Sequence, residues 1–215
     1  MTQESFRHKG LRKGLIETLQ KKGIKNAKVL NAINSVQRHR FLDEAFSEWA
    51  YKDQAFQIAC DQTISQPYTV ARQTELLELK DTDVVLEIGT GSGYQACVLA
   101  LLCKKVYTIE RHKFLFEKTA QLLIDLGFGS IRTLFGDGYK GSPRFAPFDK
   151  IIVTAAAPNI PETLCQQLKI GGYLVVPVGK DEVQKMVRVT RTAQNEFKEE
   201  IFGNYKFVPF LKGVN

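Results

Sequence analysis

Three acidic residues and a glycine-rich turn are the features of this 215-residue sequence best suited to binding a ligand. The turn Glu87-Ile88-Gly89-Thr90-Gly91-Ser92-Gly93 follows a short apolar segment and precedes a segment of helical character. Glycines there allow the backbone to turn tightly and to approach a ligand closely. Glu110 ends a second apolar segment, about 20 residues after the first glycine of the turn. Asp137 follows a third apolar segment, so the three acids are expected at neighbouring strand ends.

The spacing of the glycines distinguishes between two classes of nucleoside ligand. A dinucleotide fingerprint reads G-x-G-x-x-G, whereas this turn reads G-x-G-x-G and continues with Tyr94. A dinucleotide also brings a pyrophosphate to the helix N-terminus. A glycine loop preceded by an acid such as Glu87 looks like the first motif of S-adenosylmethionine enzymes. That ligand carries a cationic sulfonium and an ammonium and no phosphate, so a carboxylate near the loop suits it. Glu110 is then placed to bind the ribose hydroxyls, and Asp137 to bind the adenine amino group.

Each of these features also has a simpler interpretation. The glycine segment is compatible with an ordinary turn, Glu110 beside Arg111 with a surface ion pair, and Asp137 with a turn residue. Their combination at three successive strand ends favours nucleoside binding over the separate interpretations.

Strands and helices alternate after about residue 80, as required to bring these residues together. Strands are expected at residues 84–88, 106–109, 131–135, 151–153 and 173–178, and helices at 95–102, 114–126 and 160–168. This alternation predicts an α/β fold with a doubly wound, Rossmann-like sheet that is mostly parallel. With the glycine loop that looks like an S-adenosylmethionine motif, we expect the sheet of a methyltransferase. Val187-Arg188-Val189 and Phe207-Val208-Pro209-Phe210 predict an antiparallel C-terminal hairpin at the sheet edge.

The segments before the sheet are predominantly helical. Residues 1 to about 50 predict N-terminal helices interrupted at Gly23, residues 51–68 a loop, and residues 69–79 a further helix. We therefore expect one compact domain with three parts. Residues 1–60 form an N-terminal helical cap, 61–180 the S-adenosylmethionine-binding core, and 181–215 the C-terminal edge strands and a substrate flap.

With these motifs in view, the sequence resembles a known family over nearly its whole length. Gln62-Thr63-Ile64-Ser65-Gln66-Pro67-Tyr68 is similar to the substrate-loop motif of the protein-L-isoaspartate(D-aspartate) O-methyltransferase family, which is S-adenosylmethionine-dependent and of class I. Residues 85–96 are similar to its cofactor motif. Residues 151–158, 171–179 and 207–210 look like its later segments.

The resemblance implies methyl transfer from S-adenosylmethionine to the free carboxylate of L-isoaspartyl residues in damaged proteins, which is a repair reaction. It implies that Ser65 is catalytic and that Thr63, Ser65 and Val208 contact the substrate. The cofactor-binding residues expected on the same basis are Gln62, Thr63, Ser65, Glu87, Gly89, Gly91, Glu110, Asp137 and Gly138. The acceptor carboxylate is already ionised at neutral pH, so Ser65 has to orient it and no general base is needed.

Three positions depart from the family pattern and leave two alternatives open. Asp61 stands where glycine is usual, Gln37 where proline is usual, and Gln73 where an apolar residue is usual. A negative charge at Asp61 would repel an anionic substrate, so one alternative is a cofactor-binding homologue with weak activity. The other is an RNA methyltransferase on the same fold. Against it, residues 154–158 lack the Asp/Asn-Pro-Pro-aromatic stretch that clamps a flipped base.

Composition restricts the partners and the location. The net charge of +7 is spread along the chain, so we expect a solvated surface and no nucleic-acid partner. No apolar run of about 18 residues and no signal segment is evident, which predicts a cytoplasmic protein without a membrane partner. The four cysteines form no CxxC pair and the three histidines are scattered, which predicts free thiols and no metal site. We expect a monomer that acts on isoaspartyl-containing peptides and proteins.

Overall fold

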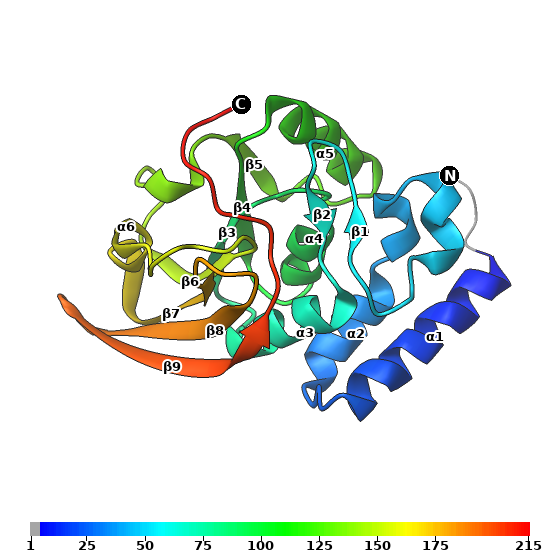
Figure 1. Cartoon of the computed structure of the whole chain (residues 1–215), viewed down its shortest axis with the longest axis horizontal. Helices are drawn as coiled ribbons and strands as arrows, with labels where there is room; N and C mark the ends of the chain where they lie inside the picture. The colour runs from blue at the N-terminus through cyan, green and yellow to red at the C-terminus, as the bar shows by residue number, and fades with distance from the viewer. Residues whose placement is uncertain (1–4) are drawn as a thin grey trace.

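The computed structural model describes residues 5–215, and a seven-stranded sheet forms its centre (Figure 1). The parallel strands are β3 (Val84–Ile88), β4 (Lys105–Glu110), β5 (Arg132–Phe135), β6 (Phe148–Val153) and β7 (Leu168–Val178). Two antiparallel strands, β8 (Gln184–Ala193) and β9 (Glu196–Tyr205), complete the order β5-β4-β3-β6-β7-β8-β9. β3 lies between β4 and β6, so the winding reverses beside it. Open α/β sheets bind ligands at such a reversal, beyond the carboxyl ends of the strands. The predicted doubly wound sheet is confirmed.

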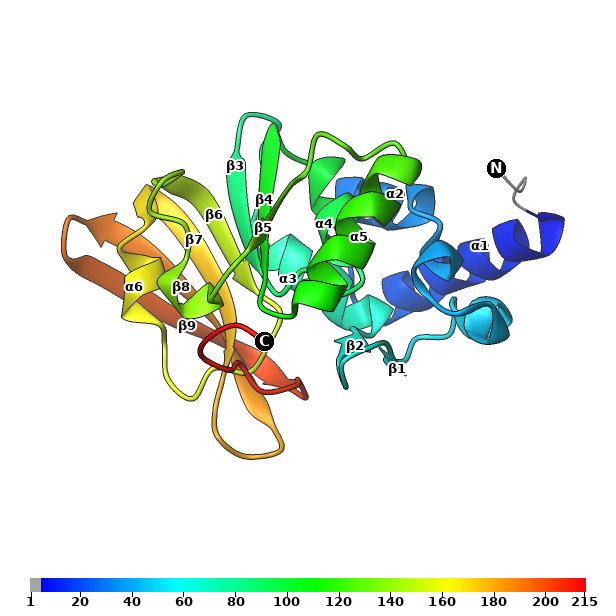
Figure 2. The same ribbon diagram turned by 90° about the horizontal axis from the view of Figure 1, so that it is seen from above.

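Helices cover both faces of this sheet (Figure 2). α3 (Pro67–Leu76), α4 (Tyr94–Ala100) and α5 (Lys113–Asp125) lie on one face, and α6 (Glu162–Cys165) lies on the other. Successive strand residues enter opposite cores: Val85 packs into the first core and Leu86 into the second. Because both of their faces are buried, the central strands β3 and β6 are mostly apolar, whereas the edge strand β5 is partly exposed.

The N-terminal helices extend the first core. Ser5 caps α1 (Phe6–Lys21), and Asn26 caps α2 (Ala27–Ser35) by accepting hydrogen bonds from two backbone N–H groups. Gly23, with φ of +96°, ends α1 as predicted. Two 3₁₀ helices, η1 (Arg38–Phe41) and η2 (Glu44–Trp49), complete the cap. Residues 1–4 of the predicted helical region lie outside the described residues.

No helix within residues 5–215 is both long and apolar enough to cross a membrane.

Two predicted boundaries differ from the structure. The segment expected as a loop contains a small hairpin, β1 (Phe56–Gln57) with β2 (Thr63–Ile64), and α3 begins directly after it at Pro67. The helix expected at residues 160–168 is only the short α6. Leu168 is fully buried and pairs with Phe148 as the first residue of β7, so strand pairing there overrides the helical periodicity.

The C-terminal hairpin has a different second strand from the one predicted. β8 (Gln184–Ala193) pairs with β9 (Glu196–Tyr205), and two residues join them. The expectation that residues 207–210 form a hairpin strand is wrong. They leave the sheet and form a parallel bridge between Pro209 and Ala156, which follows β6. Proline has no N–H for a strand ladder, and the segment instead crosses in front of the parallel strands (Figure 1).

Candidate active site

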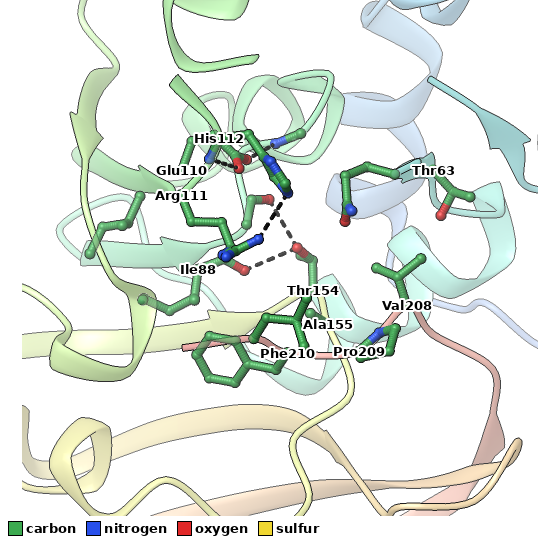
Figure 3. A pocket seen from close by; sticks show the side chains of 16 residues that line it. Thr63, Ile88, Glu110, Arg111, His112, Thr154, Ala155, Val208, Pro209 and Phe210 are labelled. Carbon is green, nitrogen blue, oxygen red and sulfur yellow. Dashed lines mark hydrogen bonds between the residues drawn. The ribbon is translucent and has the colours of Figure 1, made fainter. Parts of the chain in front are cut away.

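The glycine turn after β3 packs tightly against the residue that follows β6. Gly89 has φ of +98°, a backbone conformation that favours glycine. A Cβ atom at Gly89 would lie only 2.5 Å from Oγ1 of Thr154. The Thr154 hydroxyl is 3.0 Å from the carbonyl oxygen of Ile88 and 2.9 Å from that of Gly89 (Figure 3). The turn therefore presents bare backbone at the end of β3.

Glu110, the last residue of β4, ties the glycine turn to its neighbouring strand. One carboxylate oxygen accepts a hydrogen bond of 2.9 Å from the Gly91 N–H, and the other accepts one of 2.9 Å from the His112 N–H. Glu110 is only 4% exposed. Each carboxylate oxygen still has a lone pair for a further donor, so Glu110 can also accept a hydrogen bond from a ligand hydroxyl.

Glu87 lies behind the turn and is fully buried on β3. The Thr108 hydroxyl donates a 2.6 Å hydrogen bond to one of its oxygens, and the other oxygen has no partner among the described residues. Burial raises the pKa of Glu87 to about 8. The side chain of Glu87 is therefore mostly a neutral carboxylic acid at pH 7, and it is enclosed by other groups of the protein.

The segment that carries Ser65 follows β2 and is held by two buried residues of the cap. The guanidinium of Arg38 donates a 2.9 Å hydrogen bond to the Ser65 carbonyl. Asp53 accepts hydrogen bonds from the N–H of Tyr68 at 2.7 Å and from the Gln66 side-chain amide at 3.1 Å. Within residues 5–215 no protein group hydrogen-bonds to the Ser65 hydroxyl, so the hydroxyl is free to bind a substrate.

The C-terminal segment crosses the carboxyl ends of the parallel strands. The Phe210 N–H donates a 2.8 Å hydrogen bond to the carbonyl of Ala156, and the Phe210 ring stacks on Tyr139 with 3.9 Å between centroids. Further along, the Gly213 N–H donates a 3.0 Å hydrogen bond to Asp137. These contacts fix the segment above the ends of β5 and β6.

Together these segments enclose a cavity with about 570 Å³ of empty space, including the part open to solvent. We name it the cofactor cavity, because most of the residues predicted to bind the cofactor line it. Seven residues of the predicted site line it: Gln62, Thr63, Gly89, Gly91, Glu110, Gly138 and Val208. Three do not line it: Ser65, Glu87 and Asp137. Ser65 lines an adjacent cavity, the Ser65 cavity, and Thr63 lines both.

Sequence reasoning missed several residues of the cofactor cavity: Ile88, Ile109, Arg111, His112, Thr154, Ala155, Pro209, Phe210 and Leu211. Arg111, His112 and Thr154 directly follow the ends of β4 and β6, so their positions after predicted strands could have identified them. The route of residues 209–211 depends on tertiary contacts and left no such signal.

Two of the three unusual residues have clear structural positions. Asp61 is exposed at the tip of the β1–β2 turn, with φ of +53°, and lines neither cavity. A positive φ explains why glycine is favoured there. Gln73 is buried and its amide donates a 3.0 Å hydrogen bond to the carbonyl of Val153, so it supports the end of β6.

Comparison with known sequences identifies the family. The sequence model of the family described as "Protein-L-isoaspartate(D-aspartate) O-methyltransferase" matches residues 10–215. The chain belongs to this family. A protein-L-isoaspartate O-methyltransferase from Christiangramia forsetii is 54% identical over 212 residues, which cover 99% of each chain. One from Flavobacterium psychrophilum is 54% identical over 209 residues, covering 97% of this chain and 98% of the relative.

Solved structures share the fold of this isoaspartate methyltransferase family. One protein-L-isoaspartate O-methyltransferase superposes with a TM-score of 0.83 and 27% identity; the match covers 92% of this chain and 65% of that one. A structure from Plasmodium falciparum, described as a complex with S-adenosyl-L-homocysteine, gives a TM-score of 0.82 at 24% identity, covering 94% and 99% of the two chains.

Family membership confirms the predicted enzyme class. The chain is an S-adenosylmethionine-dependent methyltransferase of the isoaspartate repair type, and its relatives match it along almost their whole length.

Proposed function

We propose that this chain methylates L-isoaspartyl carboxylates at the junction of the two cavities, with Ser65 orienting the acceptor. The cofactor cavity lies at the reversal in strand order, and the Ser65 cavity adjoins it through Thr63. The observation that carries the proposal is this contiguity, because it lets a methyl donor and a carboxylate meet beside one free hydroxyl.

The residues of the cofactor cavity suit S-adenosylmethionine. Glu110 offers a carboxylate to the ribose. The glycine turn offers backbone groups that no side chain covers, and there is no room for a Cβ atom at Gly89. Ile109 and Phe210 add apolar surface for a planar base. When bound, the cofactor supplies an electrophilic methyl group on a cationic sulfur.

Asp137 retains its predicted role with the adenine amino group as part of this proposal. Its two oxygens already accept hydrogen bonds from the N–H groups of Tyr139 and Gly213. A carboxylate has about four acceptor positions, so both contacts are compatible with a further donor. Asp137 would then couple cofactor binding to the position of the C-terminal segment. We propose that this segment, including Val208, covers the peptide.

The protein contributes orientation and charge to the reaction. Carboxylic acids with pKa values near 4 are ionised at neutral pH, so the acceptor needs no base. The Ser65 hydroxyl would donate one hydrogen bond to the carboxylate and direct the second oxygen toward the cofactor cavity. Lys206 lines the Ser65 cavity and adds a positive charge that attracts the acceptor. Correct alignment of two reactants can lower a barrier by several kcal/mol.

A labelled-methyl assay with matched isoaspartyl and aspartyl peptides tests this proposal. We expect labelling of the isoaspartyl peptide alone. Ser65→Ala should lose most of the turnover while binding S-adenosylhomocysteine normally, and Ser130→Ala, an exposed serine at the opposite end of β5, should behave as wild type. Full turnover by Ser65→Ala would contradict the assigned role, and labelling of RNA instead of peptide would contradict the substrate.

We further propose that the protein acts as a cytoplasmic monomer on polypeptides, and not on nucleic acids or membranes. The support is the dispersed charge of the sequence. Sedimentation analysis and cell fractionation test the monomeric state and the location.

A further inference from the structure

A groove rich in basic and aromatic residues continues from the Ser65 cavity on the side away from the cofactor cavity. Lys22, Lys25, Arg72, Arg188 and Phe202 are among the residues that line this basic groove. Tyr68 and Tyr205 line both the basic groove and the Ser65 cavity. The cofactor cavity and the Ser65 cavity are therefore neighbours at Thr63, and the Ser65 cavity and the basic groove are neighbours at the two tyrosines.

More cationic than acidic side chains line the basic groove. Its four cationic side chains face two lining carboxylates, Glu75 and Glu78. The side chain of Glu75 is only 10% exposed, and it accepts hydrogen bonds from Arg72 and from the N–H groups of Lys25 and Asn26. The carboxylate of Glu75 therefore already accepts hydrogen bonds within the wall of the groove. Glu78 pairs with Arg188 at 2.6 Å and is more than half exposed.

One of the four cations is not neutralised by a neighbouring acid. Lys25 is exposed, and its ammonium has no acidic partner among residues 5–215. The other three cations lie in ion pairs: Lys22 with Asp53, Arg72 with Glu75, and Arg188 with both Glu78 and Glu200. An added carboxylate would thus meet an unpaired positive charge at Lys25.

The aromatic residues hold the cations at the surface of the groove. The Lys22 ammonium lies 5.7 Å from the centroid of Tyr68, and the guanidinium groups of Arg72 and Arg188 lie 5.7 and 5.1 Å from the centroid of Phe202. Such stacking keeps long side chains extended along an apolar face. These contacts order the cationic side chains along the wall of the groove.

We propose that the basic groove binds an acidic flank of the polypeptide substrate, so that isoaspartyl sites with a nearby Asp or Glu on that side are preferred. This inference rests on the proposed function of Ser65. An isoaspartyl residue whose carboxylate reaches the cofactor cavity through the Ser65 cavity must have its polypeptide chain continue outward. The basic groove is contiguous with that exit and complements negative side chains.

A set of isoaspartyl peptides that differ only in one flanking residue, Glu or Gln, at each of five positions on either side tests this inference. For wild-type enzyme we expect kcat/KM to be about two- to fivefold higher with Glu at one or more positions on one side, the size expected of an exposed ion pair. Lys25→Glu should reverse that Glu-to-Gln ratio. Lys104→Glu, an exposed residue before β4 at the opposite end of the strands, should keep the wild-type ratio. The preference should also weaken as salt is raised.

The outcomes separate this inference from the proposed function. If isoaspartyl peptides are methylated but the Glu and Gln series are equal at every position, or if Lys25→Glu and Lys104→Glu change the ratio alike, the basic groove does not select acidic flanks. If no isoaspartyl peptide is methylated, the proposed function itself fails. A ratio that inverts only for Lys25→Glu establishes the groove as a specificity site.

Discussion

The guanidinium of Arg38 donates a 2.9 Å hydrogen bond to the backbone carbonyl of Ser65, although 27 positions separate the two residues in the sequence. Arg38 is fully buried, and its Nε–H donates a second hydrogen bond of 2.9 Å to the carbonyl of Ala50. Burial lowers the pKa of Arg38 to about 10, so the side chain is still cationic at neutral pH. It therefore anchors the active-site segment to the helical cap.

The first prediction concerns this anchor. Arg38→Lys keeps the charge but loses the planar set of donors that reaches both carbonyls. We expect kcat for an isoaspartyl peptide to fall by about tenfold or more, because Ser65 is no longer held in place. The affinity for S-adenosylhomocysteine should remain unchanged, since Arg38 does not line the cofactor cavity. Steady-state kinetics and calorimetric titration measure the two effects.

A double-variant cycle separates positioning from a general structural role. In the Ser65→Ala background, Arg38→Lys should cause little further loss of kcat, because the hydroxyl that it positions is absent. Arg40→Lys, a half-buried neighbour outside both cavities, is the matched control and should retain kcat. Equal losses from Arg38→Lys with and without Ser65 would show that Arg38 acts only on overall structure.

The second prediction concerns the pH dependence of stability. Burial raises the pKa of Glu87 from its ordinary 4.5 to about 8, so between these values the folded state holds a proton that the unfolded state releases. The resulting stabilisation is complete below pH 4.5 and is lost as the pH rises to about 8. Glu87→Gln cannot ionise, so its free energy of unfolding should exceed that of the wild type by about 2 kcal/mol or more above pH 8.

Urea unfolding at pH 5 and pH 9 measures this difference. Glu182→Gln, at an exposed glutamate, provides the control and should follow the wild type at both pH values. A stability difference between Glu87→Gln and wild type that is the same at pH 5 and pH 9 would mean that Glu87 does not titrate in this range.

The third prediction concerns the unusual aspartate. Asp61 adopts φ of +53° at an exposed turn, so Asp61→Gly should raise the free energy of unfolding by up to about 1 kcal/mol. Because Asp61 lines neither cavity, turnover should stay within about twofold of the wild type. Asp61→Ala should be less stable than Asp61→Gly at equal turnover. A large gain in turnover for Asp61→Gly would instead show that the aspartate suppresses activity in the native enzyme.

The fourth prediction concerns the wall of the cofactor cavity at Gly138. A Cβ atom at Gly138 would lie 2.4 Å from Ile88 and 3.0 Å from Phe210, and both of these residues line the cavity. Gly138→Ala should therefore displace the cavity wall and weaken S-adenosylhomocysteine binding by about tenfold. Gly129→Ala places its Cβ atom 3.9 Å from the nearest neighbour and serves as the control. Unchanged binding by Gly138→Ala would contradict the position assigned to the cofactor.

The sequence predicted the parts of the fold whose signals are local. Apolar runs located the parallel strands, because burial favours apolar residues. The glycines located the turn after β3, because positive φ angles favour glycine. Glu110 was found because it ends a strand beside that turn. It lines the cavity at the ends of these strands, and its contact with the cofactor stays a prediction.

The parts that sequence reasoning missed depend on distant contacts. The sequence does not distinguish Arg38 from the other arginines, and only folding brings its side chain to the Ser65 carbonyl. The route of residues 207–210 depends on Ala156 and Tyr139, far away in the sequence. The glutamate chosen as a cofactor contact, Glu87, lies on the strand just before the turn, yet the pleat of β3 directs it into the interior beside Thr108.

A crystal structure with S-adenosylhomocysteine and an isoaspartyl peptide tests the central claim most directly. We predict that the ribose contacts Glu110, the sulfur faces the junction at Thr63, and the isoaspartyl carboxylate lies within hydrogen-bonding distance of the Ser65 hydroxyl. A cofactor bound elsewhere on the chain, or a bound peptide whose carboxylate lies away from Ser65, would contradict the account.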